Sequence, residues 1–168
     1  MAWTRRAQLW ALLALMPLVA GVWWSSSRRP ADPPGFHLEV DLSQRQLDIV
    51  RRNEVIKSYS IAVGSRRHPT PTGAFWTGDI VWHPGWQPPD VPWARGYKYQ
   101  PPGAPANPLR GVKIYFRAPD YYIHGTNDPE SIGEAASHGC IRMAEQDAID
   151  LAQRIERAGG SVRLVIAD

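Results

Sequence analysis

The sequence predicts a mainly β domain, sandwich-like or barrel-like, with one C-terminal helix and an apolar segment that precedes the domain. Short stretches that alternate between apolar and polar side chains recur from residue 36 onward, and turn residues separate them. In this region only residues 148–158 show the spacing of apolar positions that is typical of a helix. With 168 residues, the chain has room for one domain and a short appendage.

The apolar segment at the N-terminus, residues 7–24, predicts a membrane anchor. Gln8 is its only clearly polar side chain, and as a helix it would span roughly 27 Å, close to the hydrocarbon thickness of a bilayer. Trp23 and Trp24 stand where interfacial aromatic residues are expected. A signal peptide cleaved after Ala20 is the alternative, because such peptides also have an apolar core.

Positive charge is concentrated before the domain. The first 29 residues contain four arginines and no acid, whereas the whole chain has a formal net charge of +3, so residues 30–168 sum to −1. A domain without a basic excess does not attract a nucleic-acid backbone, so we exclude this class of partner. We expect residues 1–6 to be a short cytoplasmic N-terminus, residues 25–35 a linker, and residues 36–168 a domain delivered outside the cytoplasm.

The first part of the domain is predicted to be an antiparallel meander. Residues 36–42 alternate apolar and polar side chains with a period of two, which is typical of a half-buried strand. A turn leads to a returning strand at residues 47–50, and Asn53 and Glu54 form the next turn. Residues 55–63 are then the third strand, and together the three strands begin a sheet or barrel.

Residues 75–82 are expected to form a further strand, and a different kind of segment follows it. Residues 83–111 contain eight prolines and several aromatic side chains, but no periodicity of either secondary structure. A loop of this length in a compact domain is typically functional or disordered, and the aromatic content argues against disorder. We therefore predict a lid over residues 83–111, with Trp86 and Trp93 as its large apolar contacts.

The last part of the domain combines strands with the single helix. Residues 112–116 and 121–123 are predicted strands, and His124 follows the second one directly. The helical pattern of residues 148–158 ends at two glycines, which are typical of a helix C-terminus. Residues 162–166 form the closing strand.

Cys140 is the only cysteine of the chain. It cannot form an internal disulfide, and outside the cytoplasm an unpaired thiol is a liability unless it has a chemical task. We therefore predict that Cys140 is a nucleophile. An inert buried side chain is the alternative. A zinc site formed with His124 and His138 would lack a second cysteine and an obvious fourth ligand, so we expect no metal.

A cysteine nucleophile needs a base, a group that orients the base, and donors for the oxyanion. His124 is the candidate base because imidazole titrates in the right range. Gly125 is expected to allow an unusual backbone geometry in which a main-chain carbonyl orients the imidazole. The amides of Gly139 and Cys140 are the candidate oxyanion donors, and His138 is expected to help hold the oxyanion or to shape the site.

Arg142 is the candidate residue for positioning the substrate. It lies two residues after Cys140 in the run Ser137-His138-Gly139-Cys140-Ile141-Arg142. Its planar guanidinium can bind a carboxylate through two parallel hydrogen bonds. We therefore expect a substrate that carries a carboxylate near the bond under attack.

The motifs taken together resemble a known family. His124-Gly125-Thr126, Ser131-Ile132-Gly133 and residues 137–143 closely resemble the signature of the L,D-transpeptidase catalytic domain of the YkuD type. Thr70-Pro71-Thr72-Gly73 is similar to a loop of that family before a central strand, and Asn107-Pro108-Leu109 to a segment before its next strand. The resemblance covers about residues 36–167 and implies the family's fold, mainly β with one helix.

The resemblance implies roles for four residues, with Cys140 as nucleophile, His124 as base, and His138 and Arg142 as supporting residues. We further expect Gly139 and Gly125 to belong to the catalytic site. The residues expected to bind the substrate are Arg142, Ser137, Tyr122, Trp86 and Trp93.

The implied reaction is acyl transfer on peptidoglycan stem peptides without a cofactor. Cys140 would attack the amide between the diamino acid at position three and the terminal D-residue of a tetrapeptide stem. D-Ala would leave, and an amine of a second stem, another acceptor or water would resolve the thioester. The resemblance also implies inhibition by carbapenems. From the N-terminal segment we expect action in the cell envelope on the periplasmic side, with residues 7–24 in the inner membrane.

Two other functional classes fit the same residues. A thiol carboxypeptidase or amidase would form the same thioester and pass it to water. A non-catalytic wall-binding module would need none of the chemistry of Cys140, His124 and Arg142. A product assay separates the first class from a transpeptidase, and alkylation of Cys140 separates the second.

Overall fold

The structure is a computed structural model that describes residues 35–168. The predicted N-terminus, the apolar segment 7–24 and all of the predicted linker except Gly35 lie outside the described residues. Between residues 35 and 168, no helix is both long enough and apolar enough to cross a bilayer. This part of the chain is mainly β with one α-helix, as predicted.

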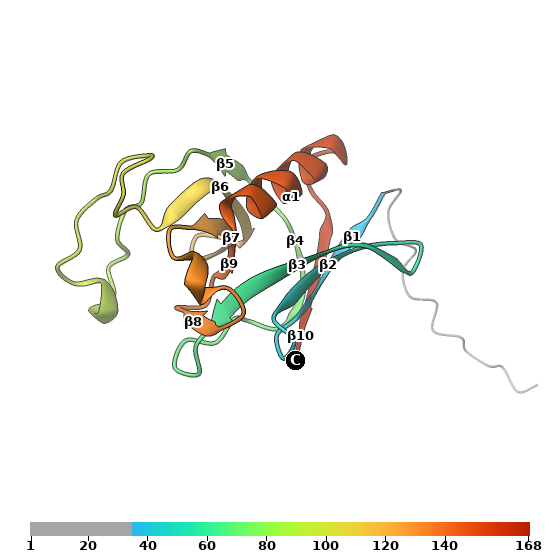
Figure 1. The fold of residues 1–168 in the computed structure, drawn as a ribbon, viewed down its shortest axis with the longest axis horizontal. Helices are drawn as coiled ribbons and strands as arrows, with labels where there is room; N and C mark the ends of the chain where they lie inside the picture. The colour runs from blue at the N-terminus through green and yellow to red at the C-terminus, as the bar shows by residue number, and fades with distance from the viewer. Residues whose placement is uncertain (1–34) are drawn as a thin grey trace, which may run out of the picture. The chain divides into compact units, whose positions relative to one another are not determined.

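The strands form a curled sheet whose two halves share strand β3 (Figure 1). Neighbouring strands follow the order β4-β10-β1-β2-β3-β9-β7-β6-β5, and β8 pairs with β3 outside this path. The elements are β1 (His37–Asp41), β2 (Gln46–Arg51), β3 (Glu54–Gly64), β4 (Gly73–Trp76), β5 (Ile80–Trp82), the 3-10 helix η1 (Pro92–Ala94), β6 (Leu109–Arg117), β7 (Tyr121–Thr126), the 3-10 helix η2 (Pro129–Ser131), β8 (Ala135–Ser137), β9 (Ile141–Met143), α1 (Glu145–Arg157) and β10 (Arg163–Ala167).

The predicted meander is confirmed. β1 pairs antiparallel with β2, and β2 pairs antiparallel with β3. Leu38 and Val40 of β1 and Leu47 and Ile49 of β2 are all buried, because alternate side chains of a strand point to the same face. The closing strand β10 pairs with β1 in parallel, so the first and last strands of the domain lie side by side.

The single strand predicted for residues 75–82 is wrong. The structure contains two short strands here, because the chain crosses from one half of the sheet to the other. β4 pairs with β10 in the first half, and β5 pairs with β6 in the second. Between them, the Thr77 amide donates to Val162 and the Gly78 amide donates to the Tyr115 carbonyl oxygen, so each backbone group finds a partner in a different half.

Helix α1 lies against the second half of the sheet, over β6 and β7 (Figure 1). Its buried side chains follow the predicted helical spacing and are Ala148, Leu151, Ala152 and Ile155. The helix ends as predicted at the two glycines. The Gly160 amide donates to the Ile155 carbonyl oxygen and the Gly159 amide to that of Glu156, which is the Schellman arrangement with a left-handed glycine.

The predicted lid is an ordered loop between β5 and β6 that projects from the second half of the sheet (Figure 1). Its last predicted residues, 109–111, belong to β6. Asn107 ties the loop together. Its fully buried side chain donates to the carbonyl oxygens of Pro84 and Pro101 and accepts a hydrogen bond from the Leu109 amide. The two ends of the loop are therefore fixed to each other.

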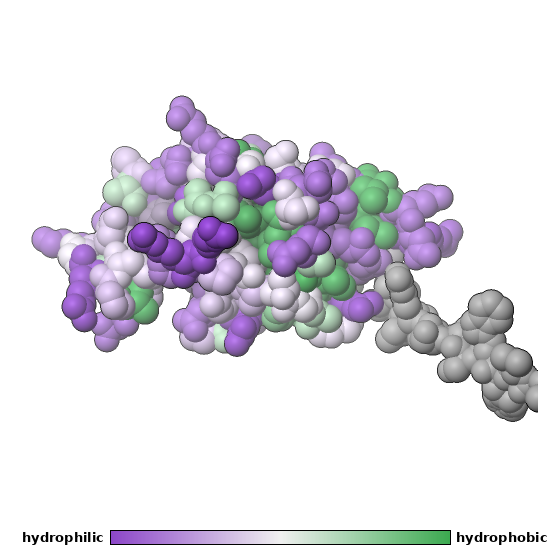
Figure 2. Space-filling model, turned by 90° about the horizontal axis from the view of Figure 1, so that it is seen from below, coloured by the Kyte–Doolittle hydropathy of each residue, from purple (hydrophilic) through white to green (hydrophobic). Residues whose placement is uncertain are grey.

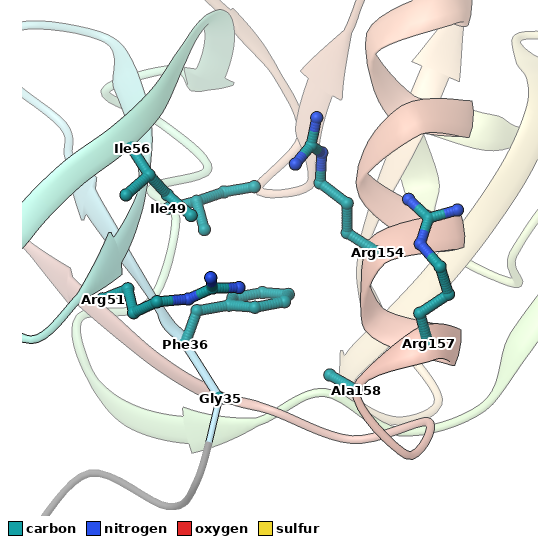
Figure 3. Close-up of a pocket in the computed structure, with 8 residues that line it drawn as sticks. All are labelled: Gly35, Phe36, Ile49, Arg51, Ile56, Arg154, Arg157 and Ala158. Atoms are coloured by element: carbon teal, nitrogen blue, oxygen red, sulfur yellow. The ribbon is translucent and has the colours of Figure 1, made fainter.

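A small hollow of about 330 Å³ lies beside the C-terminal end of α1 (Figure 3). Phe36 and Ile49 form apolar walls, and Arg51, Arg154 and Arg157 stand around them. Arg154 is paired with Asp150 of the same helix. On the face seen from below, apolar side chains reach the surface only in separate areas between hydrophilic ones (Figure 2).

Candidate active site

Cys140 lies in a tight turn between β8 and β9. Ser137, at the end of β8, is buried, and its hydroxyl closes this turn from both sides. It donates to the Cys140 carbonyl oxygen (2.6 Å) and accepts a hydrogen bond from the Gly139 amide (3.0 Å). Both hydroxyl contacts shape the turn, and Ser137 also lines the groove beside Cys140, so its substrate-binding role stays a prediction.

The same contacts correct the prediction for Gly139. Its amide donates to Ser137, so it is not free to hold an oxyanion. Gly139 is nevertheless required as glycine, because its φ of 109° lies in the left-handed region. An added Cβ would also lie 2.7 Å from Cε1 of Tyr121. The residue allows the turn to form beneath the Tyr121 ring.

His124 is buried inside β7 and does not follow a strand end, so the predicted strand boundary at residue 123 is wrong. Its Nδ1 lies 2.9 Å from the Gly125 carbonyl oxygen. Because a carbonyl can only accept, Nδ1 carries the hydrogen and Nε2 is left as the acceptor. The expected carbonyl therefore does orient the imidazole, in the tautomer that a base requires.

Gly125 is a glycine for a reason that differs from the predicted one. It continues strand β7 and does not adopt a left-handed conformation. A Cβ at this position would lie 2.5 Å from the Arg110 carbonyl oxygen and 3.0 Å from Cα of Glu145. Gly125 thus lets β6 and the start of α1 approach the strand that carries His124.

Burial keeps both Cys140 and His124 neutral at rest. It raises the pKa of the Cys140 thiol to about 11. It lowers the pKa of His124 to about 4, and the nearby positive charges of Arg142 and Lys113 add to this effect. The Cys140 thiol donates to the Asp120 carbonyl oxygen (3.4 Å), so its hydrogen points to this acceptor in the structure.

Arg142 lies on β9 directly beside His124 of β7. Its Nη1 is 3.6 Å from the Asp128 carboxylate and donates to the Ser131 hydroxyl at 3.4 Å. Asp128 is more than half exposed, so this ion pair is loose and is screened by water. The guanidinium therefore faces the site with only part of its hydrogen-bonding capacity used.

These residues line a groove of about 960 Å³ that the predicted lid borders. The ring of Trp93 stacks on that of His138, with 3.9 Å between their centroids and 15° between their planes. The ring of His68 also packs against the ring of His138, with 4.7 Å between their centroids. His138 therefore docks the lid beside the Cys140 turn, and burial lowers its pKa.

Trp86 and Trp93 have different positions in the lid. Trp86 is buried and packs edge-on against Tyr97, with ring centroids 5.6 Å apart. Its backbone pairs with that of Gln100, so it mainly holds the loop together, although it also lines the groove. Trp93 is about one-third exposed and reaches the turn that carries Cys140 through His138.

Tyr122 lies on the same face of β7 as His124, with 5.4 Å between the two ring centroids. Its side chain interacts with the Cys140 thiol, and burial together with this neighbour raises the pKa of Tyr122. Tyr122, a predicted substrate-binding residue, therefore lies directly beside the Cys140 thiol. Among residues 35–168, no three histidine, cysteine or acidic side chains are grouped closely enough to hold a metal ion.

The sequence did not single out Lys113 and Tyr115, which also line the groove. Both are on β6, and they lie opposite His124 and Tyr122 of β7. The alternation of residues 112–116 places them on one face of a strand. The pairing register between β6 and β7 brings that face into the site. β-bulges in this strand pair set the register, and no sequence pattern indicates them.

Comparisons with known proteins agree with this geometry. The family model described as the L,D-transpeptidase catalytic domain matches residues 35–164. YkuD of Bacillus subtilis, which is named as an L,D-transpeptidase, is 34% identical over 117 residues; the match covers 70% of this chain and 58% of YkuD. YqjB of the same organism, named likewise, is 30% identical over 150 residues, which cover 86% of this chain and 78% of YqjB.

Solved structures share the fold. The catalytic domain of the L,D-transpeptidase of E. faecium has a TM-score of 0.59 and 20% identity, over 79% of this chain and 96% of that one. The L,D-transpeptidase LdtMt1, solved in complex with imipenem, has a TM-score of 0.61 and 17% identity, over 79% and 59% of the two chains. With the family model matched from residue 35 to residue 164, the chain belongs to the L,D-transpeptidase catalytic domain family.

Proposed function

We propose that this chain is a cysteine-dependent L,D-transpeptidase that acts on peptidoglycan tetrapeptide stems through a thioester at Cys140. The observation that supports this most strongly is the arrangement around His124. Its Nδ1 is bound to the Gly125 carbonyl oxygen, which leaves Nε2 as a base in the groove that Cys140 also lines. The cysteine is the only one in the chain, so the thiol chemistry has a single possible position.

In the first half-reaction, the sulfur of Cys140 forms a bond to the carbonyl carbon between residue three and the terminal D-residue of the stem. The thiol proton passes to Nε2 of His124. His124 then delivers this proton to the leaving amine as the C–N bond breaks, and D-Ala departs. In the second half-reaction, an amine of another stem attacks the thioester carbonyl and gives a proton to His124. The new C–N bond forms as the C–S bond breaks, and His124 returns the proton to the sulfur of Cys140.

The neutral resting state favours proton transfer that is coupled to attack. Burial opposes charge on both Cys140 and His124, so an ion pair of the two is disfavoured before the substrate arrives. A bound substrate excludes further water and offers the carbonyl that accepts the sulfur's electron pair. Because the Gly139 amide donates to the Ser137 hydroxyl, we assign the backbone amide of Cys140 as the hydrogen-bond donor to the oxyanion.

Arg142 would determine the specificity for the donor stem, and the lid would determine which acceptor reacts. Arg142 retains donors for the carboxylate of the terminal D-residue, because its ion pair with Asp128 is loose and exposed. Trp93 lies over His138 and covers the thioester, which disfavours water as the acceptor. Because LdtMt1 has been solved with imipenem, we also propose that carbapenems acylate Cys140.

The site of action that fits this reaction is outside the cytoplasm, where peptidoglycan is cross-linked. The apolar residues 7–24 would hold the domain at the membrane. A reporter enzyme that is active only in the periplasm, fused after Asp168, tests this location. Activity of a cytoplasm-only reporter at the same position would contradict it.

The test of the function is incubation of the purified protein with a tetrapeptide donor stem and an acceptor stem, followed by mass spectrometry. The wild type should release D-Ala, carry the acyl group at Cys140 and form the cross-linked dimer. Cys140→Ala should show none of these products while it keeps the wild-type circular dichroism spectrum. Release of tripeptide without dimer would favour the hydrolase alternative. Release of D-Ala by Cys140→Ala at a tenth of the wild-type rate or more would exclude Cys140 as the nucleophile.

A further inference from the structure

Lys113, His124 and Arg142 form a row across three neighbouring strands. Lys113 of β6 is opposite His124 of β7, and His124 is level with Arg142 of β9. Residues paired in this way point to the same face of a sheet, and all three side chains line the groove. With strands about 4.8 Å apart, the backbone positions of the two cationic residues lie roughly 10 Å apart, on either side of His124.

Tyr115 and Tyr122 hold the ammonium group of Lys113 in place. Its Nζ donates to the Tyr115 hydroxyl at 2.7 Å, and it lies 4.6 Å from the ring centroid of Tyr115 and 5.2 Å from that of Tyr122. The aromatic faces attract the cation and fix a side chain that would otherwise be free to move. The charge therefore occupies a defined position beside the base.

Lys113 differs from Arg142 in having no carboxylate partner. Within the described part of the chain, no acidic oxygen lies within 4.0 Å of Nζ, whereas Arg142 has Asp128 at 3.6 Å. An ammonium group has three donors, and the Tyr115 hydroxyl accepts only one of them. A half-buried cation with free donors that faces a groove is suited to an anionic ligand.

We propose that Lys113 forms a second carboxylate subsite, which binds the side-chain carboxylate of the diamino acid at position three of the donor stem. This inference rests on the proposed transpeptidase function. Arg142 takes the carboxylate of the leaving D-residue, and Lys113, on the other side of His124, takes the carboxylate on the acyl side of the bond. The enzyme therefore selects donors whose third residue is a diamino dicarboxylic acid over those with a lysine-like residue there.

A carboxylate bound at Lys113 also has a consequence for the base. The positive charge of Lys113 disfavours protonation of His124, as does that of Arg142. Neutralisation of Lys113 by the donor stem removes part of this repulsion when His124 receives the thiol proton. The correct donor thus both binds more tightly and eases proton transfer, so KM and kcat should both respond to it.

The test compares two donor stems that differ only in whether the side-chain carboxylate of residue three is free or amidated. The wild type should use the free form with a kcat/KM roughly tenfold to a hundredfold higher, as expected for one charge-assisted hydrogen bond. Lys113→Met should bring this ratio close to one, and Lys113→Arg should restore part of it. Lys57→Met is the matched control, because Lys57 also lies over a tyrosine ring, Tyr59, but is exposed and does not line the groove.

A second measurement does not depend on turnover. Iodoacetate is anionic and iodoacetamide is neutral; both alkylate thiols, and Cys140 is the only thiol of the chain, so mass spectrometry of the Cys140 peptide follows the reaction. The ratio of the two alkylation rates should fall in Lys113→Met and stay at the wild-type value in Lys57→Met. If the wild type turns over neither donor, the proposed function fails while this ratio still tests the subsite. A donor ratio and an alkylation ratio that are both unchanged in Lys113→Met would overturn the inference.

Discussion

The ring of Trp93 lies nearly parallel to the ring of His138, with 3.9 Å between their centroids. This contact joins the middle of a long loop to the turn that holds Cys140, because His138 is two residues from Cys140. Asn107 also holds the two ends of the loop, and the Asn127 side chain donates to the Pro105 carbonyl oxygen. If Cys140 forms the proposed thioester, we expect the contact between Trp93 and His138 to limit the access of water to it.

Replacement of Trp93 by alanine should change the fate of the acyl-enzyme more than its formation. The thioester would be less covered, so water would compete better with the acceptor amine. We expect the ratio of cross-linked dimer to hydrolysed tripeptide to fall several-fold, measured by chromatography of the products. Trp76→Ala is the control, because Trp76 is exposed on β4 and does not line the groove. An unchanged ratio in Trp93→Ala would show that the loop only packs against the turn.

Much of the fold could be predicted because apolar and polar residues alternate along its strands. The meander of residues 36–63 and helix α1 show their periods in the sequence, and both were placed correctly. β8 and β9 have only three residues each, too few for a pattern, and so they were missed. The break at Thr77 was also missed, because each of the two short strands is apolar and their partners are distant in sequence.

Residue types alone predict the candidate site. The predictions that differ from the structure, for Gly139 and Gly125, depend on backbone geometry. Cys140, His124 and Arg142 were identified by their chemistry, and the structure brings them together in one groove. The occupied Gly139 amide and the close approach at Gly125 arise from contacts that a sequence does not record. Lys113 joins the site only through the register between β6 and β7.

The pH dependence of turnover should reflect the buried state of His124. Its pKa lies at about 4, so the imidazole is neutral and able to accept a proton above this value. The rate should therefore stay nearly constant from about pH 5 to pH 8 and fall as the pH drops through about 4, in a profile of kcat/KM against pH. An inflection near the ordinary histidine pKa of about 6.5 would contradict the assignment.

The same shift predicts a pH dependence of stability. Because the folded pKa of His124 is below its unfolded value of about 6.5, the unfolded state binds more protons between pH 6.5 and 4. The free energy of unfolding should be highest above this window and decrease through it as the pH falls, by on the order of 3 kcal/mol. His124→Gln should flatten the dependence in urea titrations. Replacement of the exposed His83 by asparagine should leave it unchanged.

Substitution of Gly139 by alanine tests the geometry of the turn that holds Cys140. The residue has a φ of 109°, and an added Cβ would lie 2.7 Å from Cε1 of Tyr121. We expect a loss of stability of about 1–3 kcal/mol and a slower alkylation of Cys140, because the turn must shift. Gly133→Ala is matched, since Gly133 also has a positive φ of 91° but no atom lies within 4 Å of the added Cβ. If the two variants are alkylated at equal rates, the geometry of this turn does not control the reactivity of the Cys140 thiol.

Replacement of Arg142 by lysine tests how the leaving residue is recognised. Lysine keeps the charge beside His124 but loses the planar pair of donors, so binding of the terminal carboxylate should weaken. One charge-assisted hydrogen bond corresponds to roughly a tenfold to hundredfold loss in kcat/KM, measured with the tetrapeptide donor. A donor whose terminal carboxylate is amidated should show little further loss in this variant, since the interaction is already absent. Arg154→Lys, which alters an arginine paired with Asp150 on the outer part of α1, should leave turnover at the wild-type level. An equal factor of loss in kcat/KM with both donors would contradict this role. Arg142 would then act through its contacts with Asp128 and Ser131 to shape β9, and the terminal carboxylate would be recognised elsewhere in the groove.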